Sequence, residues 1–444
     1  MNRSLPYQPT RRIGLTGRRG RLPLVALLFV GLASAGLASA GLGVTPAFAA
    51  AKATKATKAA SGSSNLACVG SGNGKGKKIV IGSLQTDASS SAAFPEITEG
   101  MKACFDAINA TGGINGRPID YRRCNDNADA VVGEKCARDL IAAKAIAVLG
   151  GICFSCFSAP VVDVLDKGGV PYVGGLPVLP DEYKQTNFLA ITNAGGRAAL
   201  YTNAAYIMGT AKKKKVAASV VEVYAGVGEP DLTLEARIKK LGGNFVARIG
   251  FDPTAADLAS IAQQAIDKKP NFISVQTDGP NTVKLVTNLR SQGYKGDIVV
   301  LGTATAPQSI EAMGAAGNGV YVASFFPDLG AGSGPDAKKF QADMRKGGFD
   351  PRRAFAGSGY AAAYATAVAL SQVKGPITAP SFTKALLRLD GIQPLFGGQL
   401  SYKNATAEFP RSFYFAAYGN VILDGRTILT GDAFNWLTGE PING

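Results

Sequence analysis

Two patterns of hydrophobic and polar residues alternate between Lys78 and Leu301. Short runs rich in β-branched residues are typical of buried strands, and the stretches between them carry apolar residues at helical spacing. Ile97, Met101 and Phe105, for example, share one face of a predicted helix. The expected strands in the first half are Lys78–Leu84, Ile119–Arg123, Ile146–Leu149 and Val170–Val173, and the expected helices are Glu96–Asn109, Ala130–Ala143 and Ser158–Lys167.

The same alternation begins again near Val216. The expected strands are Val216–Val221, Phe245–Ile249, Phe272–Gln276 and Ile298–Leu301, and the expected helices are Leu232–Leu241, Leu258–Lys268 and Thr282–Gln292. Strands that alternate with helices form parallel sheets covered by helices on both faces. Because 444 residues exceed one ordinary core, we predict an α/β fold with two doubly wound parallel-sheet lobes. Ligands bind beyond the carboxyl ends of such strands, so two lobes predict one shared cleft.

The N-terminal segment has the features of an export signal. Arg-rich residues 11–21 precede the apolar stretch Leu22–Val44, and Ala47–Ala49 forms an A-x-A cleavage site. We therefore predict a signal peptide over residues 1–49, with an uncleaved membrane anchor as the alternative. Residues 50–76 are rich in Ala, Lys, Ser and Gly, which predicts a flexible tether. The mature chain is expected in the periplasm, the cell envelope or the medium.

Charge and histidine content exclude several classes of function. Residues 1–78 contain twelve Lys and Arg and no acid, so only +3 of the net charge of +15 belongs to the rest of the chain. A nearly neutral body predicts no basic face and no nucleic-acid partner. The chain has no His, which removes Ser-His-Asp and Cys-His catalysis and imidazole metal sites. We expect no catalytic residues, no cofactor and no metal.

Six cysteines in an exported chain predict disulfides, and six allow about 15 connectivities. We favour Cys124–Cys136, because a strand end and the start of the next helix can lie close together. Cys153 and Cys156 are either a structural pair or a redox pair, and an exported cysteine-dependent enzyme is therefore an alternative function. Zinc is disfavoured because the spacings form no paired C-x-x-C knuckles. Asn65–Cys68 is similar to a lipobox, but its Leu is one position late.

From about Lys78 to Asp424 the chain resembles periplasmic binding proteins of the leucine/isoleucine/valine type, which are extracytoplasmic receptors of ABC importers. The most specific segment, EGMKACFDAINATGGINGRPIDY at 99–121, resembles the first helix, Gly-rich turn and second strand of that family. The type I fold of the family implies a three-strand hinge, with crossovers near Gly195, Ser324 and Glu408. Lobe 1 would comprise residues 77–195 and 325–407, and lobe 2 residues 196–324 and 408–444.

The resemblance also implies a ligand site. In amino-acid-binding members a Ser after the third strand and a Thr after the fourth hold the ligand carboxylate, and these positions fall on Ser155 and Val178. The acids that hold the ligand ammonium fall on Gly196 and Ala304. A buried ammonium without a carboxylate costs several kcal/mol or more. We therefore expect a small organic ligand other than an ordinary branched-chain amino acid.

Three further residues complete the expected site. Asp278 lies where the family often has an aromatic contact; it either replaces the missing acid or caps the helix beginning near Asn281. Phe94 and Tyr224 lie on loops at the cleft edge and are expected to stack on the ligand, with core packing as the alternative. The resemblance implies a monomer that closes on its ligand, an amino-acid-like molecule or small carboxylate or amide, and docks on an ABC permease. A sensor subunit of the same fold is the alternative.

Overall fold

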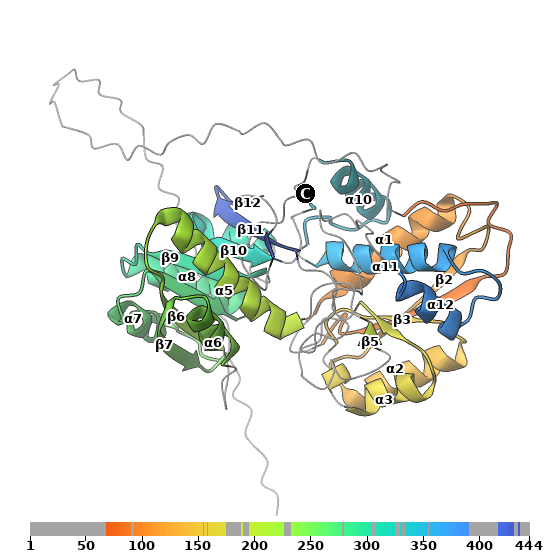
Figure 1. The fold of residues 1–444 in the computed structure, drawn as a ribbon, viewed down its shortest axis with the longest axis horizontal. Coiled ribbons are helices and arrows are strands. Elements are labelled where there is room, and N and C mark those ends of the chain that lie inside the picture. Colours follow the sequence, from red (N-terminus) through yellow and green to blue (C-terminus); the bar gives the residue numbers. More distant parts are fainter. Residues whose placement is uncertain are drawn as a thin grey trace, which may run out of the picture. The chain divides into compact units, whose positions relative to one another are not determined.

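The computed structural model describes residues 68–89, 93–153, 155–157, 159–174, 188–189, 195–225, 232–277, 279–302, 307–324, 329–330, 332, 334–353, 355–389, 416–429 and 434–435. These residues form two separate sheets with flanking helices (Figure 1). The predicted signal peptide, most of the predicted tether, and the predicted site residues Val178, Asp278 and Ala304 lie outside the described residues.

The first sheet belongs to lobe 1 and is parallel throughout, in the order β2-β1-β3-β4-β5. The sheet is built from β1 (Ile79–Gln85), β2 (Ile119–Asn125), β3 (Val148–Leu149), β4 (Tyr172–Val173) and β5 (Phe188–Leu189). The helices of this lobe are α1 (Pro95–Ala110), α2 (Ala130–Ala142), η1 (Ser155–Phe157), α3 (Ala159–Lys167), α10 (Pro335–Lys346), α11 (Ala356–Ser371) and α12 (Ala379–Leu386). The strand–helix alternation that the periodicity predicted for residues 78–173 is confirmed, with ends shifted by up to two residues.

The second sheet belongs to lobe 2 and has eight described strands, in the order β12-β11-β10-β9-β8-β6-β7, with β13 paired to β11. They are β6 (Ser219–Ala225), β7 (Asn244–Phe251), β8 (Phe272–Gln276), β9 (Asp297–Leu301), β10 (Tyr321–Ser324), β11 (Ala416–Leu423), β12 (Arg426–Leu429) and β13 (Phe434–Asn435). Its helices are α5 (Gly195–Lys214), α6 (Thr233–Lys240), α7 (Ala259–Asp267), α8 (Gly279–Ser291), α9 (Pro307–Met313) and η3 (Gly314–Gly317). The strands β6 to β10 are parallel, whereas β11 pairs antiparallel with β10, β12 and β13, which the sequence did not predict.

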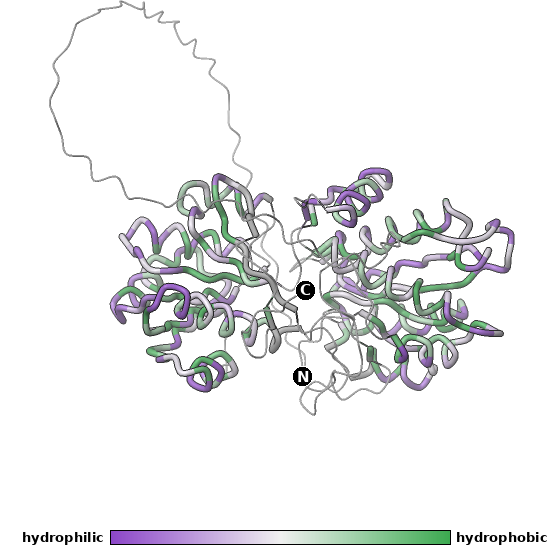
Figure 2. Tube along the Cα trace, turned by 45° about the horizontal axis from the view of Figure 1, so that its top comes forward, coloured by the Kyte–Doolittle hydropathy of each residue, from purple (hydrophilic) through white to green (hydrophobic). Residues whose placement is uncertain are grey.

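Each sheet carries its own hydrophobic core. In lobe 2, Val221 and Val223 of β6 face α7 and α8, whereas the preceding residue, Val220, faces α5 and α6 on the other side of the sheet. Figure 2 shows the strands as hydrophobic segments between more polar helices. A strand buried on both faces reads as a continuous apolar run, as expected for parallel sheets covered by helices.

The hydrophobic core of lobe 1 includes residues from the distant segment 335–389. Helices α1 and α11 lie side by side (Figure 1), and they approach closely because glycines sit at the crossing. A Cβ at Gly100 would lie 2.0 Å from the carbonyl oxygen of Ala356, and a Cβ at Gly359 would lie 1.8 Å from that of Ile97. Thirteen of the sixteen residues of α11 are buried, so this helix lacks the one-sided periodicity that sequence analysis detects.

All six cysteines are paired, as Cys68–Cys104, Cys124–Cys136 and Cys153–Cys156. The predicted pair Cys124–Cys136 is confirmed. Cys68 is 2% exposed and holds the chain to α1, which places its sulfur in a disulfide and removes it as a lipid anchor.

The last nine residues of the predicted tether pack against the turn that follows α1. The Ser71 N–H donates to the Gly113 carbonyl at 2.7 Å, and the Gly116 N–H donates to the Ser71 carbonyl at 2.6 Å. This segment is therefore part of lobe 1 from Cys68 onward, because a disulfide and backbone hydrogen bonds fix it. Among the described residues we find no helix with the length and hydrophobicity needed to cross a bilayer.

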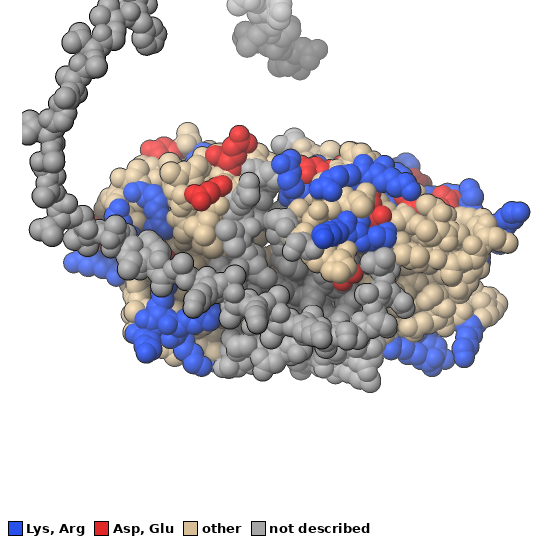
Figure 3. All heavy atoms as spheres, turned by 90° about the horizontal axis from the view of Figure 1, so that it is seen from above, with Lys and Arg blue, Asp and Glu red and all other residues tan. Residues whose placement is uncertain are grey.

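Charged side chains on the face drawn in Figure 3 form separate groups of Lys and Arg with Asp and Glu between them. Many of the pairs are short-range and exposed, such as Lys102–Asp106 at 2.6 Å and Arg138–Glu134 at 2.5 Å. Exposed pairs of this kind contribute about 0.3–0.5 kcal/mol each to stability. These pairs keep the surface of the described helices solvated and contribute little to the stability of the fold.

Candidate functional site at the carboxyl ends of the strands

In lobe 1, backbone and side-chain hydrogen bonds join the loops that follow β1, β2 and β3. The Thr86 N–H donates to the Ile152 carbonyl at 3.0 Å, which ties the loop after β1 to the loop after β3. The Asn125 Oδ1 accepts the N–H groups of Asp87 and Ala88 at 3.0 and 3.2 Å, which ties β2 to the same loop. Three strand ends therefore form one rigid edge.

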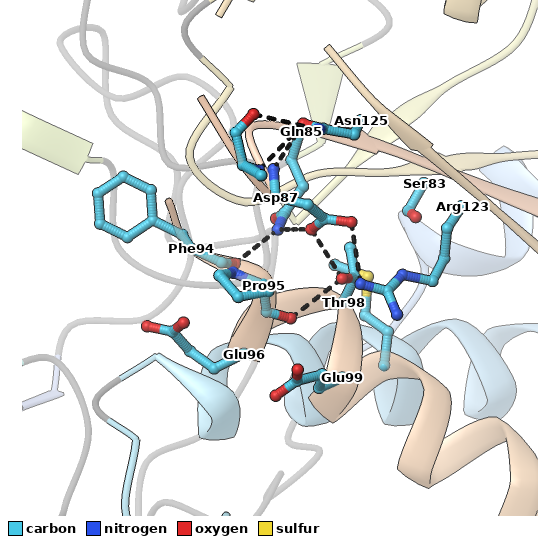
Figure 4. Close-up of polar contacts among 12 residues, drawn as sticks. Ser83, Gln85, Asp87, Phe94, Pro95, Glu96, Thr98, Glu99, Arg123 and Asn125 are labelled. Atoms are coloured by element: carbon cyan, nitrogen blue, oxygen red, sulfur yellow. Dashed lines mark hydrogen bonds and ion pairs between the residues drawn. The ribbon is translucent and has the colours of Figure 1, made fainter. Parts of the chain in front are cut away.

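Asp87 is the centre of this edge (Figure 4). Its Oδ1 accepts hydrogen bonds of 2.7 Å from both Gln85 Nε2 and Thr98 Oγ1, and its Oδ2 lies 3.0 Å from Arg123 Nη2. The carboxylate side chain is 12% exposed. A carboxylate with these three partners is fully used within the chain, so Asp87 is an internal anchor and is not left over to pair with a ligand cation.

Phe94, a predicted ligand contact, is held by this network. Gln85 Nε2 donates to the Phe94 carbonyl at 2.9 Å, and the Phe94 N–H donates to the Thr86 carbonyl at 3.1 Å. The Phe94 ring points away from the Asp87 carboxylate in Figure 4 and packs edge-to-face on Phe355, with the ring centroids 5.9 Å apart. Core packing thus accounts for one edge of the ring, and stacking on a ligand stays a prediction.

Ser155, the other predicted contact in this lobe, lies in a buried turn closed by the Cys153–Cys156 disulfide. Its N–H donates to Asp126 Oδ2 at 2.9 Å, and Asp126 is fully buried. The Ser155 side chain packs against α2, since a Cβ at Gly133 would lie 2.2 Å from its Oγ, and the residue is 2% exposed. The structure therefore places Ser155 at the predicted strand end with its hydroxyl turned toward the helix.

A third segment reaches the same edge from the distant sequence before α11. Arg353 Nη2 lies 3.0 Å from Glu96 Oε2, and Arg353 Nη1 lies 3.7 Å from Glu99 Oε2. Burial raises the pKa of Glu96 above its ordinary value, and the nearby Arg353 opposes that rise. Neither glutamate stands alone, because one guanidinium bridges the two carboxylates.

In lobe 2, Tyr224 and Gln276 are neighbours at the carboxyl ends of β6 and β8, where they are paired in register. The Tyr224 ring leans over β7, since a Cβ at Gly250 would lie 3.0 Å from its Cζ and hydroxyl oxygen. Gln276 is 8% exposed, and its Nε2 donates to Ser274 Oγ at 2.6 Å. Its Oε1 is buried and accepts no hydrogen bond.

Among the described residues, the buried acid near these strand ends is Glu222, and it is already paired. Glu222 Oε2 accepts from Arg248 Nε at 2.7 Å, and both side chains are largely buried. The Lys239 side chain, which is hydrogen-bonded to Glu235, lowers the pKa of that carboxylate, and Arg248, which also bonds Glu235, lowers it further. Acids in the described part of the lobe 2 edge are thus internally compensated.

The structure brings Ser155 and Phe94 to one edge of the first sheet and places Tyr224 at the corresponding edge of the second. Sequence reasoning missed the residues that hold these edges together, namely Gln85, Asp87, Asn125, Asp126, Gln276 and Arg353. For all of them except Arg353, the available signal was an acid or amide at the end of a predicted strand or within three residues after it. Within the described ranges, no cluster of His, Cys, Asp and Glu suits a metal ion. All six cysteines are in disulfides, with Cys153 and Cys156 paired to each other.

The family of the chain follows from its similarity to known proteins. Residues 78–420 match the family described as periplasmic binding protein, and the chain belongs to that family. Its fold is that of the leucine/isoleucine/valine-binding type, an α/β fold of two lobes. No curated protein matched the sequence.

Solved structures support the fold. The leucine-binding protein LivK from Thermotoga maritima is 18% identical, with a TM-score of 0.65, and the match covers 80% of this chain and 99% of that one. The branched-chain amino acid transporter substrate-binding protein LivJ from Streptococcus pneumoniae, in complex with isoleucine, is 20% identical, with a TM-score of 0.64 and coverage of 80% and 100%. A substrate-binding periplasmic protein from Ralstonia solanacearum is 18% identical, with a TM-score of 0.64 and the same coverage.

Proposed function

We propose that the chain is an extracytoplasmic solute-binding receptor of an ABC-type importer, which binds a small organic ligand between its two lobes and closes on it. The observation that carries the proposal is the match of residues 78–420 to the periplasmic binding protein family. The rigid strand-end edge of lobe 1 supports it, because preorganised loops reduce the entropy lost when a ligand binds. A receptor of this kind performs no covalent chemistry.

Six residues are proposed to line the ligand site. Ser155, Val178 and Phe94 would contribute from lobe 1, and Tyr224, Asp278 and Ala304 from lobe 2. The proposed lobes are residues 77–195 with 325–407, to which the segment from Cys68 to Gly76 is added, and residues 196–324 with 408–444, joined by three strands that act as a hinge. Closure about a hinge desolvates the ligand from both sides, which is the usual way such clefts bind small molecules.

The proposed ligand is an amino-acid-like molecule or a small carboxylate or amide. The engagement of Asp87, Asp126 and Glu222 inside the chain supports a ligand without a strongly paired ammonium. We further propose export by the predicted signal peptide, a monomeric mature chain and docking of the closed form on an ABC permease.

The test is to purify the mature chain, starting near residue 50, from an exporting host and to compare its mass under native and denaturing conditions. A small molecule that co-purifies and dissociates on denaturation is expected, together with a decrease in radius of gyration by X-ray scattering when it is added back. A chain that binds no small molecule and does not change its radius with any extract of metabolites would contradict the proposal.

A matched pair of variants tests the site. Phe94→Ala should weaken binding of the co-purified molecule by about tenfold or more, because a stacked aromatic side chain buries a large apolar area. Phe349→Ala removes an aromatic side chain of similar partial burial at the end of α10 and should leave binding unchanged. Equal effects of the two variants would argue that Phe94 acts only through packing.

A further inference from the structure

Gln276 is the last residue of β8. One polar atom of its side chain makes a hydrogen bond, and the other makes none. The Nε2 group donates to Ser274 Oγ at 2.6 Å. Oε1 is then the remaining polar atom, and it is buried without a hydrogen-bond partner. Leaving a buried acceptor unpaired costs free energy, and such a group in a folded protein calls for an explanation.

The position of Gln276 supplies that explanation. It stands at the carboxyl end of a central parallel strand, in register with Tyr224 on β6, where α/β sheets bind ligands. Gln85 holds the same position at the end of β1 in lobe 1, and its Oε1 is also unpaired. A Cβ at Gly151 would lie 2.4 Å from that oxygen, so Gln85 faces the backbone of its own lobe. Gln276 is therefore the better candidate for a ligand contact.

The charges around Gln276 indicate the kind of ligand group it would accept. Glu222 is bound to Arg248, and Asp252 is exposed, with its Oδ1 accepting from Thr254, so the described part of this edge holds no buried acid that lacks a cationic partner. An uncharged acceptor suits an uncharged donor, since a buried ammonium requires a carboxylate. The N–H groups of a carboxamide or a urea fit this environment.

We propose that Gln276 is a specificity-determining residue of the ligand site and that its Oε1 accepts an N–H of a neutral amide-type ligand. The inference rests on the proposed receptor function and sharpens its ligand class. Asp278 lies outside the described residues and is the alternative acceptor for the same ligand N–H, which the experiment below tests.

The experiment measures binding of six probes by calorimetry: benzamide, benzoate, benzylamine, isobutyramide, isobutyrate and L-valine. The neutral amides are expected to bind the unmodified chain at least about tenfold more tightly than the matched carboxylates and amines. Gln276→Met removes the acceptor with little change of shape and should weaken amide binding by about tenfold. Preference for L-valine or benzylamine over both amides would overturn the inference.

Gln292→Met is the matched control. Gln292 also uses its Nε2, which donates to the Ala259 carbonyl at 3.0 Å, and also has a buried unpaired Oε1. It follows α8 and precedes β9, at the amino ends of the strands, so its substitution should leave amide binding unchanged. The two variants should change the melting temperature by similar amounts, because each loses one Nε2 hydrogen bond and one unpaired acceptor. Equal amide affinity of Gln276→Met and Gln292→Met would overturn the assignment.

Two more variants separate the remaining outcomes. Gln276→Glu keeps an acceptor and adds charge, so it should shift selectivity from benzamide toward benzylamine by at least about tenfold, even if Gln276→Met folds poorly. Asp278→Asn should leave amide binding within about twofold. Loss of amide binding in Asp278→Asn with none in Gln276→Met would transfer the role to Asp278. If the co-purified molecule binds but neither amide binds at millimolar concentration, this inference fails while the proposed receptor function stands.

Discussion

The crossing of α1 and α11 gives the sharpest test of how lobe 1 is packed. A Cβ at Gly359 would lie 1.8 Å from the backbone carbonyl oxygen of Ile97, whereas real Cβ atoms essentially never approach within 3.0 Å. Gly359→Ala must therefore separate the helices by about 1.2 Å, the difference between those distances. Overpacking of a core costs about 1–3 kcal/mol, and backbone that blocks the new atom puts this case near the upper end.

The helix propensity of Ala offsets part of that cost. Replacing Gly by Ala in a helix interior gains about 1 kcal/mol, so the net destabilisation is about 2 kcal/mol. The matched control is Gly209→Ala in α5, where no atom lies within 4 Å of the new Cβ. That variant should become more stable by up to about 1 kcal/mol, for the same propensity reason.

Urea and thermal unfolding measure the difference between the two variants. A loss of about 2 kcal/mol corresponds to a decrease in melting temperature of about 4–8 °C in a domain of this size. The reasoning would be refuted if Gly359→Ala were as stable as Gly209→Ala, because the close approach would then have no energetic consequence.

Two further predictions concern the lobe 1 edge. Asp126→Ala should lower the free energy of unfolding by about 1–3 kcal/mol and should speed hydrogen exchange of the Ser155 amide at least tenfold. Asp129→Ala is the control: it removes only the N-cap of α2 and should leave the Ser155 amide protected. Because burial raises the pKa of Glu96 above its ordinary 4.5, its stabilising contribution is present below that value and lost as pH rises through the raised pKa. The stability of the parent chain relative to Glu96→Gln should therefore fall as the pH rises above about 4.5. A difference in stability that stays constant with pH would exclude the shift.

The two disulfides near the strand ends explain why the lobe 1 edge can be rigid without a large local core. Cys124–Cys136 joins the end of β2 to α2, and Cys153–Cys156 closes the turn after β3. Short loops at the carboxyl end of a sheet have little apolar surface to bury, so covalent links and hydrogen bonds to backbone groups replace packing. This arrangement is consistent with export into an oxidising compartment.

The alternation of strands and helices and the presence of two sheets were determined by the sequence, because each element with one or two buried faces leaves a local periodic record. Phe272–Gln276 is a strand with the predicted bounds, and Ala130–Ala142 differs from its predicted helix by one residue. The family resemblance and the Cys124–Cys136 pair could also be predicted from local segments.

Tertiary structure decided what no local pattern records. Helix α11 is buried on all sides and therefore has no apolar stripe, and its place beside α1 depends on glycines 259 residues apart in sequence. The contacts that tie Asp87 to Asn125 and Asp126 to Ser155 span 38 and 29 residues. Hydrogen bonds of this range form only after the sheet has brought its strand ends together, so the sequence could predict where a site would lie but not which side chains would remain available in it.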